Sequence, residues 1–296
     1  MNMNLTMAME GFYSLKVHGG RRGEIDFGTH KNLILDAGIT RMLNGEAPLS
    51  YIHVGSGSSQ PNVGQVQLDA NFANTRRGRN IVHGYVSADD SESGKAYGYS
   101  RLEVQFDKGA AKGNISEIGV CDNDGGSPLW SRSLILDKSG NPTSITILDD
   151  EYLTVTYELR RYVSTETVTT TIQYEDDGEM KSVECSVVPS RWIDSENGWA
   201  SAGVTNAHNL KYQYLKNPES STGTLKVDGN SASILFKYNV DEGNDIDLSG
   251  MTTHATSGGT SATPIPEFTT LAFNPPLRKT NEFELTIGIT VTIERA

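Results

Sequence analysis

The chain has few cysteines, no long apolar run and little positive charge. Only Cys121 and Cys185 occur among 296 residues, so a disulfide framework is excluded and a zinc site would need mostly histidine ligands. We expect both cysteines to be buried as small apolar residues. No window approaches twenty apolar residues, which excludes a spanning helix. The first residues lack the basic segment of a secretory signal, so we expect synthesis in the cytoplasm and no membrane insertion.

Positive charge is scarce relative to negative charge. The chain has 25 lysines and arginines against 37 aspartates and glutamates, for a formal net charge of −12. Such a field repels a nucleic-acid backbone, so we expect no nucleic-acid partner. Arg76, Arg77 and Arg79 form the one basic cluster. We expect it to face solvent or the carboxylates of a neighbouring subunit, and contact with nucleic acid is the alternative.

Patterns that indicate catalysis or metal binding are also scarce. The histidines are dispersed, with no pair at a spacing that would begin a metal site or a catalytic triad. Asp122, Asp124 and Gly125 resemble part of a calcium loop but lack its closing glutamate, so a turn is the better interpretation. Residues 241–247 could hold a hard cation, although acidic turns are usually solvated. We therefore predict no catalytic residue, no cofactor and no metal.

The remaining features favour β-structure. Residues 115–162 are predicted to form three strands joined by turns at 122–126 and 137–142, where Asp, Asn, Gly and Pro gather. In the last of these strands, apolar side chains recur at every second position in two short sets, from Ile145 and from Leu153. This spacing gives one apolar face and one wet face, as in an antiparallel sheet.

Shorter alternating segments extend this pattern along the whole chain. In residues 97–106 the alternation changes phase near Ser100 and Arg101, which predicts a bulge. Hairpins are predicted for residues 12–27 and 168–189, and a turn at 228–230.

One short helix is predicted, with Asp36 as its N-cap, Ile39, Met42 and Leu43 on one face, and a stop at Asn44. A helix of about two turns is unstable alone, so it should lie on a sheet.

Regular spacing pauses between Val163 and Glu166, so we predict two antiparallel β-sandwich domains, residues 1–163 and 164–296. Both regions end with a strand, a turn that contains proline, and a long alternating strand that runs back beside the first. These segments are residues 129–159 and 268–293. An internal duplication is one interpretation. The other is that any two antiparallel hairpins look alike at this level.

Aromatic residues gather in one polar stretch of the second half. Trp192, Trp199, Tyr212 and Tyr214 are therefore our candidate binding or interface residues, either as a sugar-stacking platform or as an anchor between subunits. The alternative is that they fill the core of the second domain.

Residues 25–162 carry an ordered set of short motifs. Each is weak alone, and their order makes the set more specific. They are KNLILDAG (31–38), IHVGSGS (52–58) followed by Pro61 and Leu68, ISEIGV (115–120), LWSRSLI (129–135) and DEYLTVTY (150–157).

In these motifs the first half resembles the amino-terminal part of tailed-bacteriophage tail and tail-fibre proteins. The resemblance implies a virion structural protein of a tail, baseplate, collar or fibre attachment, which forms homo-oligomers, binds other tail proteins and performs no catalysis. A repetitive shaft and a coiled coil are absent from the sequence, which favours an adaptor near the tail body. The loops at 55–61 and 249–266 would then be ordered by neighbouring proteins.

Two alternative functions remain at this point. The first is a receptor- or carbohydrate-binding tail module that contacts host-surface glycan through Trp192 and Trp199. The second is an enzyme acting on surface polysaccharide, which needs paired acidic residues in a groove. Its candidates would come from residues 149–151 or from Asp245 and Asp247.

Overall fold

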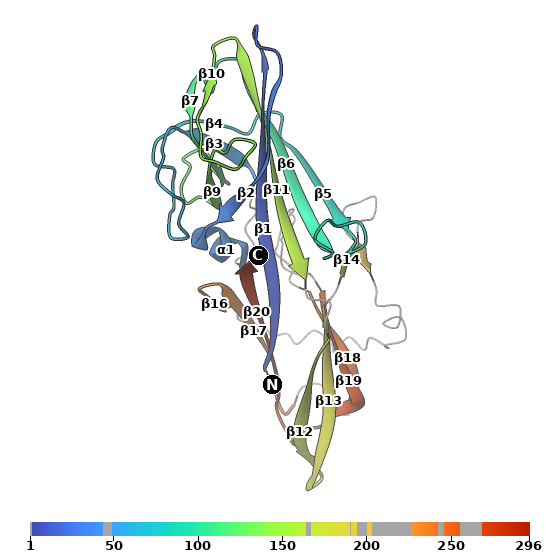
Figure 1. The fold of residues 1–296 in the computed structure, drawn as a ribbon. Coiled ribbons are helices and arrows are strands. Elements are labelled where there is room, and N and C mark those ends of the chain that lie inside the picture. The colour runs from blue at the N-terminus through green and yellow to red at the C-terminus, as the bar shows by residue number, and fades with distance from the viewer. Residues whose placement is uncertain are drawn as a thin grey trace. The chain divides into compact units, whose positions relative to one another are not determined.

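The computed structural model describes residues 2–43, 49–163, 167–189, 191–193, 200–202, 226–241, 246–254 and 268–296. Within these ranges the chain is mainly β with one α-helix, as predicted (Figure 1). No helix in them is long and apolar enough to cross a membrane.

The chain forms two compact units. The amino-terminal unit contains Ala8–Tyr162 and Glu294–Ala296, and the carboxy-terminal unit contains the described residues from Val163 to Ile293 together with the start of the chain up to Met7. The predicted ranges were 1–163 and 164–296. In the structure, the residues up to Met7 belong to the carboxy-terminal unit, and Glu294–Ala296 belong to the amino-terminal unit.

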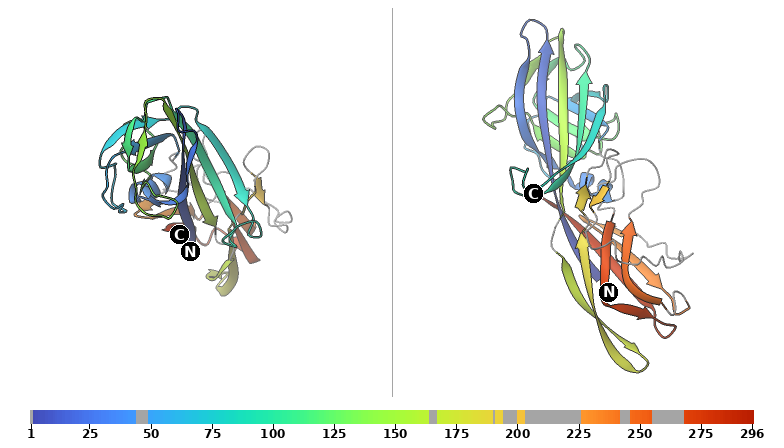
Figure 2. Two further views of the ribbon diagram at one scale, coloured as in Figure 1. Left: turned by 45° about the horizontal axis from the view of Figure 1, so that its top comes forward. Right: turned by 90° about the vertical axis from the view of Figure 1, so that its right-hand side faces the viewer.

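The amino-terminal unit is built from two sheets that share one strand. One sheet has the order β2, β1, β11, β6, β5, and its strands lie side by side in the right-hand view of Figure 2. The other has the order β2, β9, β8, β3, β4, and β7 pairs separately with β10. The elements are β1 (Asn2–Gly19), β2 (Ile25–Ile34), α1 (Asp36–Leu43), β3 (Tyr51–Gly55), β4 (Asn71–Thr75), β5 (Asn80–Val86), β6 (Tyr97–Phe106), β7 (Gly113–Ile115), β8 (Glu117–Cys121), β9 (Ser131–Leu134), β10 (Ile145–Ile147) and β11 (Glu151–Val163).

The core of this unit follows from the alternation of its strands. Every second residue of β1 from Met7 to Val17 is buried, and β11 buries its odd-numbered residues from Leu153 to Leu159. Tyr13 ties β1 to the end of β9 and to the segment after it, because its hydroxyl donates to the Leu134 carbonyl at 2.8 Å and accepts from the Leu136 amide at 3.1 Å. The predicted apolar face of residues 145–159 is thereby confirmed.

Two details of the prediction are wrong in this unit. Residues 115–162 form the end of β7 and four further strands rather than three strands in all, because the polar turns interrupt the chain more often than expected. The bulge near Ser100 is absent, since β6 pairs in continuous register with both β5 and β11. Leu102, Val104 and Phe106 therefore share the inner face with Ser100, while Tyr97 and Tyr99 lie on the outer face.

The predicted helix is confirmed as α1. Its buried side chains are Ile39, Met42 and Leu43, with Gly38 beside them. A Cβ atom at Gly38 would collide with the Trp130 carbonyl, so only glycine permits this contact with the segment before β9.

The carboxy-terminal unit contains a four-stranded sheet, β12, β13, β19, β18, and a pairing of β16, β17 and β20. The predicted hairpin of β12 and β13 and the turn before β17 are confirmed. The elements are β12 (Val168–Asp176), β13 (Glu179–Pro189), β14 (Arg191–Ile193), β15 (Ala200–Ala202), β16 (Lys226–Asp228), β17 (Ser231–Tyr238), β18 (Ile246–His254), β19 (Phe268–Lys279) and β20 (Leu285–Arg295).

The proline-bearing turn expected after Phe273 does not form. Pro275 and Pro276 lie inside β19, which pairs with β13 and β18, whereas β20 pairs with β17. The two strands thus belong to different sheets. The duplication stays a prediction.

Candidate functional site

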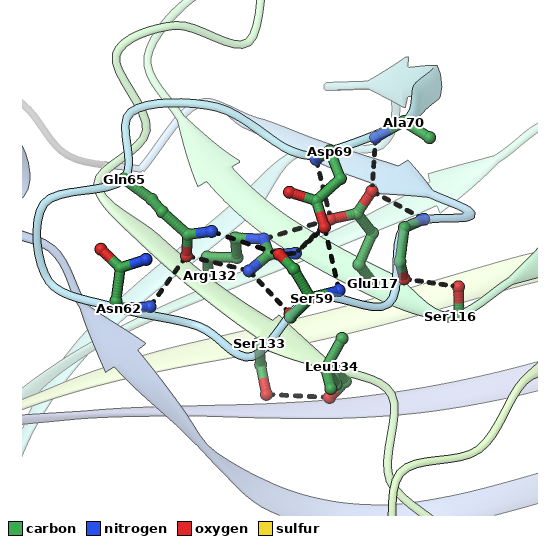
Figure 3. Close-up of polar contacts among 11 residues, drawn as sticks. Ser59, Asn62, Gln65, Asp69, Ala70, Ser116, Glu117, Arg132, Ser133 and Leu134 are labelled. Carbon is green, nitrogen blue, oxygen red and sulfur yellow. Dashed lines mark hydrogen bonds and ion pairs between the residues drawn. The ribbon is translucent and has the colours of Figure 1, made fainter.

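Arg132 and Glu117 form a buried ion pair that holds the loop between β3 and β4 (Figure 3). Both side chains are fully buried. Arg132 donates to Glu117 Oε2 from Nε at 3.1 Å and from Nη2 at 2.8 Å. It also reaches Gln65 Oε1 at 2.9 Å, Asp69 Oδ2 at 2.9 Å and the Ser59 carbonyl at 3.2 Å. We call this set, Ser59, Gln65, Asp69, Glu117 and Arg132, the loop clamp.

Glu117 completes the clamp from the other side. Its Oε1 accepts hydrogen bonds from the backbone amides of Gly57 at 2.9 Å and Ala70 at 2.8 Å, and its Oε2 accepts from the Asp69 amide at 3.1 Å. Gly55 and Gly57 are required here, because a Cβ atom at either position would overlap the Glu117 carboxylate. The loop passes so close to β8 that only glycine fits.

The clamp is a structural device. A fully buried charge costs several kcal/mol unless it is paired and hydrogen-bonded, and here the guanidinium and the carboxylate satisfy each other and the loop together. The pair links β8 to β9 and both strands to a loop about 60 residues earlier in the chain. The expectation that the loop at 55–61 is ordered by neighbouring proteins is therefore wrong, because the chain's own residues order it.

Several other sequence candidates have ordinary structural contacts. Asp122, from the sequence resembling a calcium loop, pairs with Arg41 of α1. Among the described residues no group of three or more His, Cys, Asp or Glu side chains could hold a metal ion, and most of the acidic stretch at 241–247 lies outside them. Glu151 pairs with Arg22 at 2.5 Å. The ion partner of Glu151 is thus an arginine and not a second carboxylate, which a pair of catalytic acidic residues would require.

The basic cluster and the cysteines also have contacts within the chain. Arg77 pairs with Asp107, and the Arg76 guanidinium lies 5.5 Å from the centre of the Tyr51 ring. The expectation of buried cysteines is confirmed. Burial raises the pKa of both thiols, that of Cys185 to about 11, so neither is a reactive thiolate near neutral pH.

The outer face of the β1, β11, β6 sheet carries a group of aromatic rings interleaved with arginines. We call it the aromatic–arginine patch. Its members are Phe12, Tyr97, Tyr99, Arg101, Glu158, Arg160 and Tyr162.

Arg160 lies at the centre of the patch. Its guanidinium is 4.2 Å from the centre of the Phe12 ring and 4.7 Å from that of Tyr97, within the range of cation–π attraction. Arg101 lies 5.0 Å from the Tyr99 ring. Glu158 joins the two arginines, accepting from Arg101 at 2.6 Å and from Arg160 at 2.6 Å.

The edge of the patch is fixed by a second set of charges. Glu10 accepts hydrogen bonds from Tyr162 at 2.5 Å and pairs with Lys31 at 2.5 Å. Burial raises the pKa of Glu10, but these partners and the Arg160 charge outweigh burial and hold it below its ordinary value. Burial and the neighbouring Glu10 raise the pKa of Tyr162 to about 12.

This composition suits contact with protein. Tyrosine and arginine are enriched at the energetic centres of interfaces, and here opposite charges are paired within a chain of net charge −12. The arginines already lie against the faces of Phe12, Tyr97 and Tyr99. The bulge predicted near Ser100 and Arg101 concealed the patch, because such a bulge would turn Tyr97 and Tyr99 to the inner face.

The structure does not test the four residues named as candidate binding or interface residues. Trp199, Tyr212 and Tyr214 lie outside the described residues, and for Trp192 only the backbone is described, in β14. Their role stays a prediction.

Comparison with known proteins gives no further assignment. No protein-family model matches the sequence, and searches of curated proteins and of solved structures found no significant match.

Proposed function

We propose that this chain is a non-catalytic structural component of a tailed-bacteriophage virion, which assembles with itself and with other tail proteins. The resemblance to phage tail proteins supports this, and one structural observation adds to it. Three of the motifs, at 52–58, 115–120 and 129–135, meet at the Glu117 carboxylate, which accepts from the Gly57 amide and pairs with Arg132. A fourth motif supplies Gly38, which packs on Trp130. The similarity thus concerns residues on which this fold depends.

The aromatic–arginine patch is the surface we assign to assembly. It presents Arg101 with 47% of its side chain exposed beside half-buried tyrosines, which offers both apolar area and hydrogen-bond donors to a partner. Because arginines already cover the ring faces, the patch favours a protein partner over a stacked sugar.

The test is assembly of the purified full-length chain. Light scattering, sedimentation and electron microscopy should show a symmetric oligomer, or incorporation into a complex with other tail proteins. Arg160→Ala should weaken that assembly, since it removes the cation shared by Phe12, Tyr97 and Glu158. Lys112→Ala is the matched control, because Lys112 forms an exposed pair with Asp149 away from the patch. A chain that stays monomeric and ignores every other tail component contradicts the proposal.

A further inference from the structure

Strand β12 is an outermost strand of the four-stranded sheet in the carboxy-terminal unit (Figure 1). In the described part of the chain it pairs with β13 alone, in continuous register from Val168 to Asp176. Such an edge presents unpaired backbone N–H and C=O groups, and natural proteins usually protect it with lysine, proline or a bulge. Residues 168–174 contain no charged residue, no proline and no glycine, so the edge of β12 lacks these protections.

The other outermost strands of the larger sheets, within the described ranges, are shorter or irregular. β18, at the opposite edge of the same sheet, has a register shift between Leu248 and Gly250. β16 has three residues, and β4 has five and a register shift of its own. β5 contains Gly84, which weakens a strand. β12 is therefore the edge best suited to pairing with a further strand.

The turn after β12 fixes which of its backbone groups are available. Asp177 and Gly178 both have positive φ, 53° and 72°, as in a two-residue hairpin turn of type I′. The residues on either side of such a turn, Asp176 and Glu179, form a hydrogen-bonded pair. Hydrogen-bonded and non-hydrogen-bonded pairs then alternate along the ladder. The N–H and C=O groups of the odd-numbered residues from 169 to 175 therefore point away from β13.

The apolar face of β12 is incompletely covered. On the neighbouring strand β13, Val183 is only 1% exposed. Ile172 lies opposite Val183 in the register but is only half-buried, and Tyr174 on the same face of β12 is also half-buried. A further strand beside β12 would cover both side chains, and burial of apolar surface favours association.

We propose that β12 pairs antiparallel with β12 of a second copy of this chain, with Ile172 opposite Ile172 of that copy. All nine residues of β12 then take part. Thr171 of each copy lies opposite Gln173 of the other, so the backbone groups that point away from β13 meet across the interface. The two Ile172 side chains continue the apolar row that begins at Val183.

Charge supports a second copy in this orientation. The charged residues of β12, Glu175 and Asp176, lie together at one end of the strand. Antiparallel pairing sets them opposite Thr169 and Val168 of the other copy, whereas parallel pairing would set like charges side by side, which is destabilising. The strand is thus complementary to itself in one direction only. The inference rests on the self-assembly proposed above and assigns it a second surface.

Cross-linking of the full-length chain tests the register. Paired residues at a non-hydrogen-bonded position have Cα atoms about 4.5 Å apart, within the range of a disulfide. Ile172→Cys should therefore form a disulfide-linked dimer under mild oxidation, seen on a non-reducing gel. Glu175→Cys is the control, because its two thiols would lie at opposite ends of the interface although Glu175 is the more exposed residue. Equal cross-linking of the two variants, or none of Ile172→Cys, overturns the proposal.

Charge variants test the same contact without a cross-link. The double variant Thr171→Lys with Gln173→Lys should weaken self-association about tenfold in sedimentation, because lysines face lysines across the interface. Replacing both residues with glutamate should weaken it similarly. Mixing the lysine and glutamate variants should restore association, which also shows that both fold. The control places two lysines at Ser139 and Asn141, exposed turn residues of the amino-terminal unit, and should change nothing.

The outcomes separate this inference from the proposed function. If the chain self-associates and the β12 variants leave that association unchanged, pairing through β12 is wrong and the proposed function stands. If the chain stays monomeric but joins a complex with other tail proteins, the same holds. A chain that stays monomeric and joins no such complex contradicts both.

Discussion

The sharpest prediction concerns the loop clamp. Arg132→Leu replaces a fully buried cation with an apolar side chain and leaves the Glu117 carboxylate with only its three backbone donors. Breaking a buried ion pair by removing one partner costs about 3–5 kcal/mol. Whole domains are typically stable by about 5–15 kcal/mol, so the amino-terminal unit should lose a large share of its stability.

The measurement must report on this unit separately, because a chain with two compact units need not unfold in one step. Urea unfolding followed by hydrogen exchange of peptides from β6 and β11 gives the free energy of the amino-terminal unit. Peptides covering residues 56–70 report on the loop directly. We expect the loop to lose protection first and the strands to unfold at lower urea.

Arg77→Leu is the matched control for this experiment. Arg77 also pairs with an aspartate, Asp107, but 67% of its side chain is exposed, and exposed pairs contribute about 0–1 kcal/mol. If Arg132→Leu costs no more than Arg77→Leu, burial of the pair is not what holds the loop, and the reasoning fails.

Three further predictions follow from packing and titration. Gly55→Ala should destabilise the amino-terminal unit, because its Cβ atom would lie 2.5 Å from Glu117 Oε1 and 2.7 Å from the Ala70 carbonyl oxygen. Thermal unfolding measures the effect. Gly64→Ala is the control and should change it little, because the atom nearest to its Cβ would be 3.7 Å away. Burial raises the pKa of Tyr13 and of Tyr157 to about 12, so the folded state retains protons that the unfolded state loses near pH 10. The stability of the folded chain should therefore be constant in this respect below about pH 10 and fall between about pH 10 and 12. Tyrosinate absorbance that rises fully by about pH 10 in the folded chain would contradict the burial of Tyr13 and Tyr157. Ile39→Ala should cost about 2–5 kcal/mol by removing buried volume from α1, and a change under 1 kcal/mol in urea unfolding would show that α1 does not support the sheet.

Much of the fold could be predicted from local patterns. Side chains in a strand alternate between two faces, so the buried set from Leu153 to Leu159 was predictable without knowing which strand lies beside it. The helix followed from Asp36 and its apolar face in the same way. The first residues of β1 were not assigned to a strand because methionine is a weak strand signal, yet Met7 and Met9 are buried in the alternating pattern.

The site could not be predicted in that way. Gly57, Glu117 and Arg132 are far apart in the chain, and each belongs to a short motif that local patterns predict as a loop or a strand. The prediction of a bulge near Ser100 was wrong, because tyrosines on the outer face of the strand resemble a change of phase in the alternation of apolar residues. Only pairing with β5 and β11 showed that the register continues.

By itself, then, the sequence determined the class of structure: mainly β strands, one short helix and turns rich in glycine and asparagine. It also determined the acidic charge that disfavours a nucleic-acid partner. Tertiary structure alone decided which strands are neighbours and that a buried arginine and glutamate hold the loop from Gly55 to Ala70. The physical reason is that alternation has a period of two residues and says nothing of the partner strand, whereas ion pairs and pockets depend on residues brought together from distant parts of the chain.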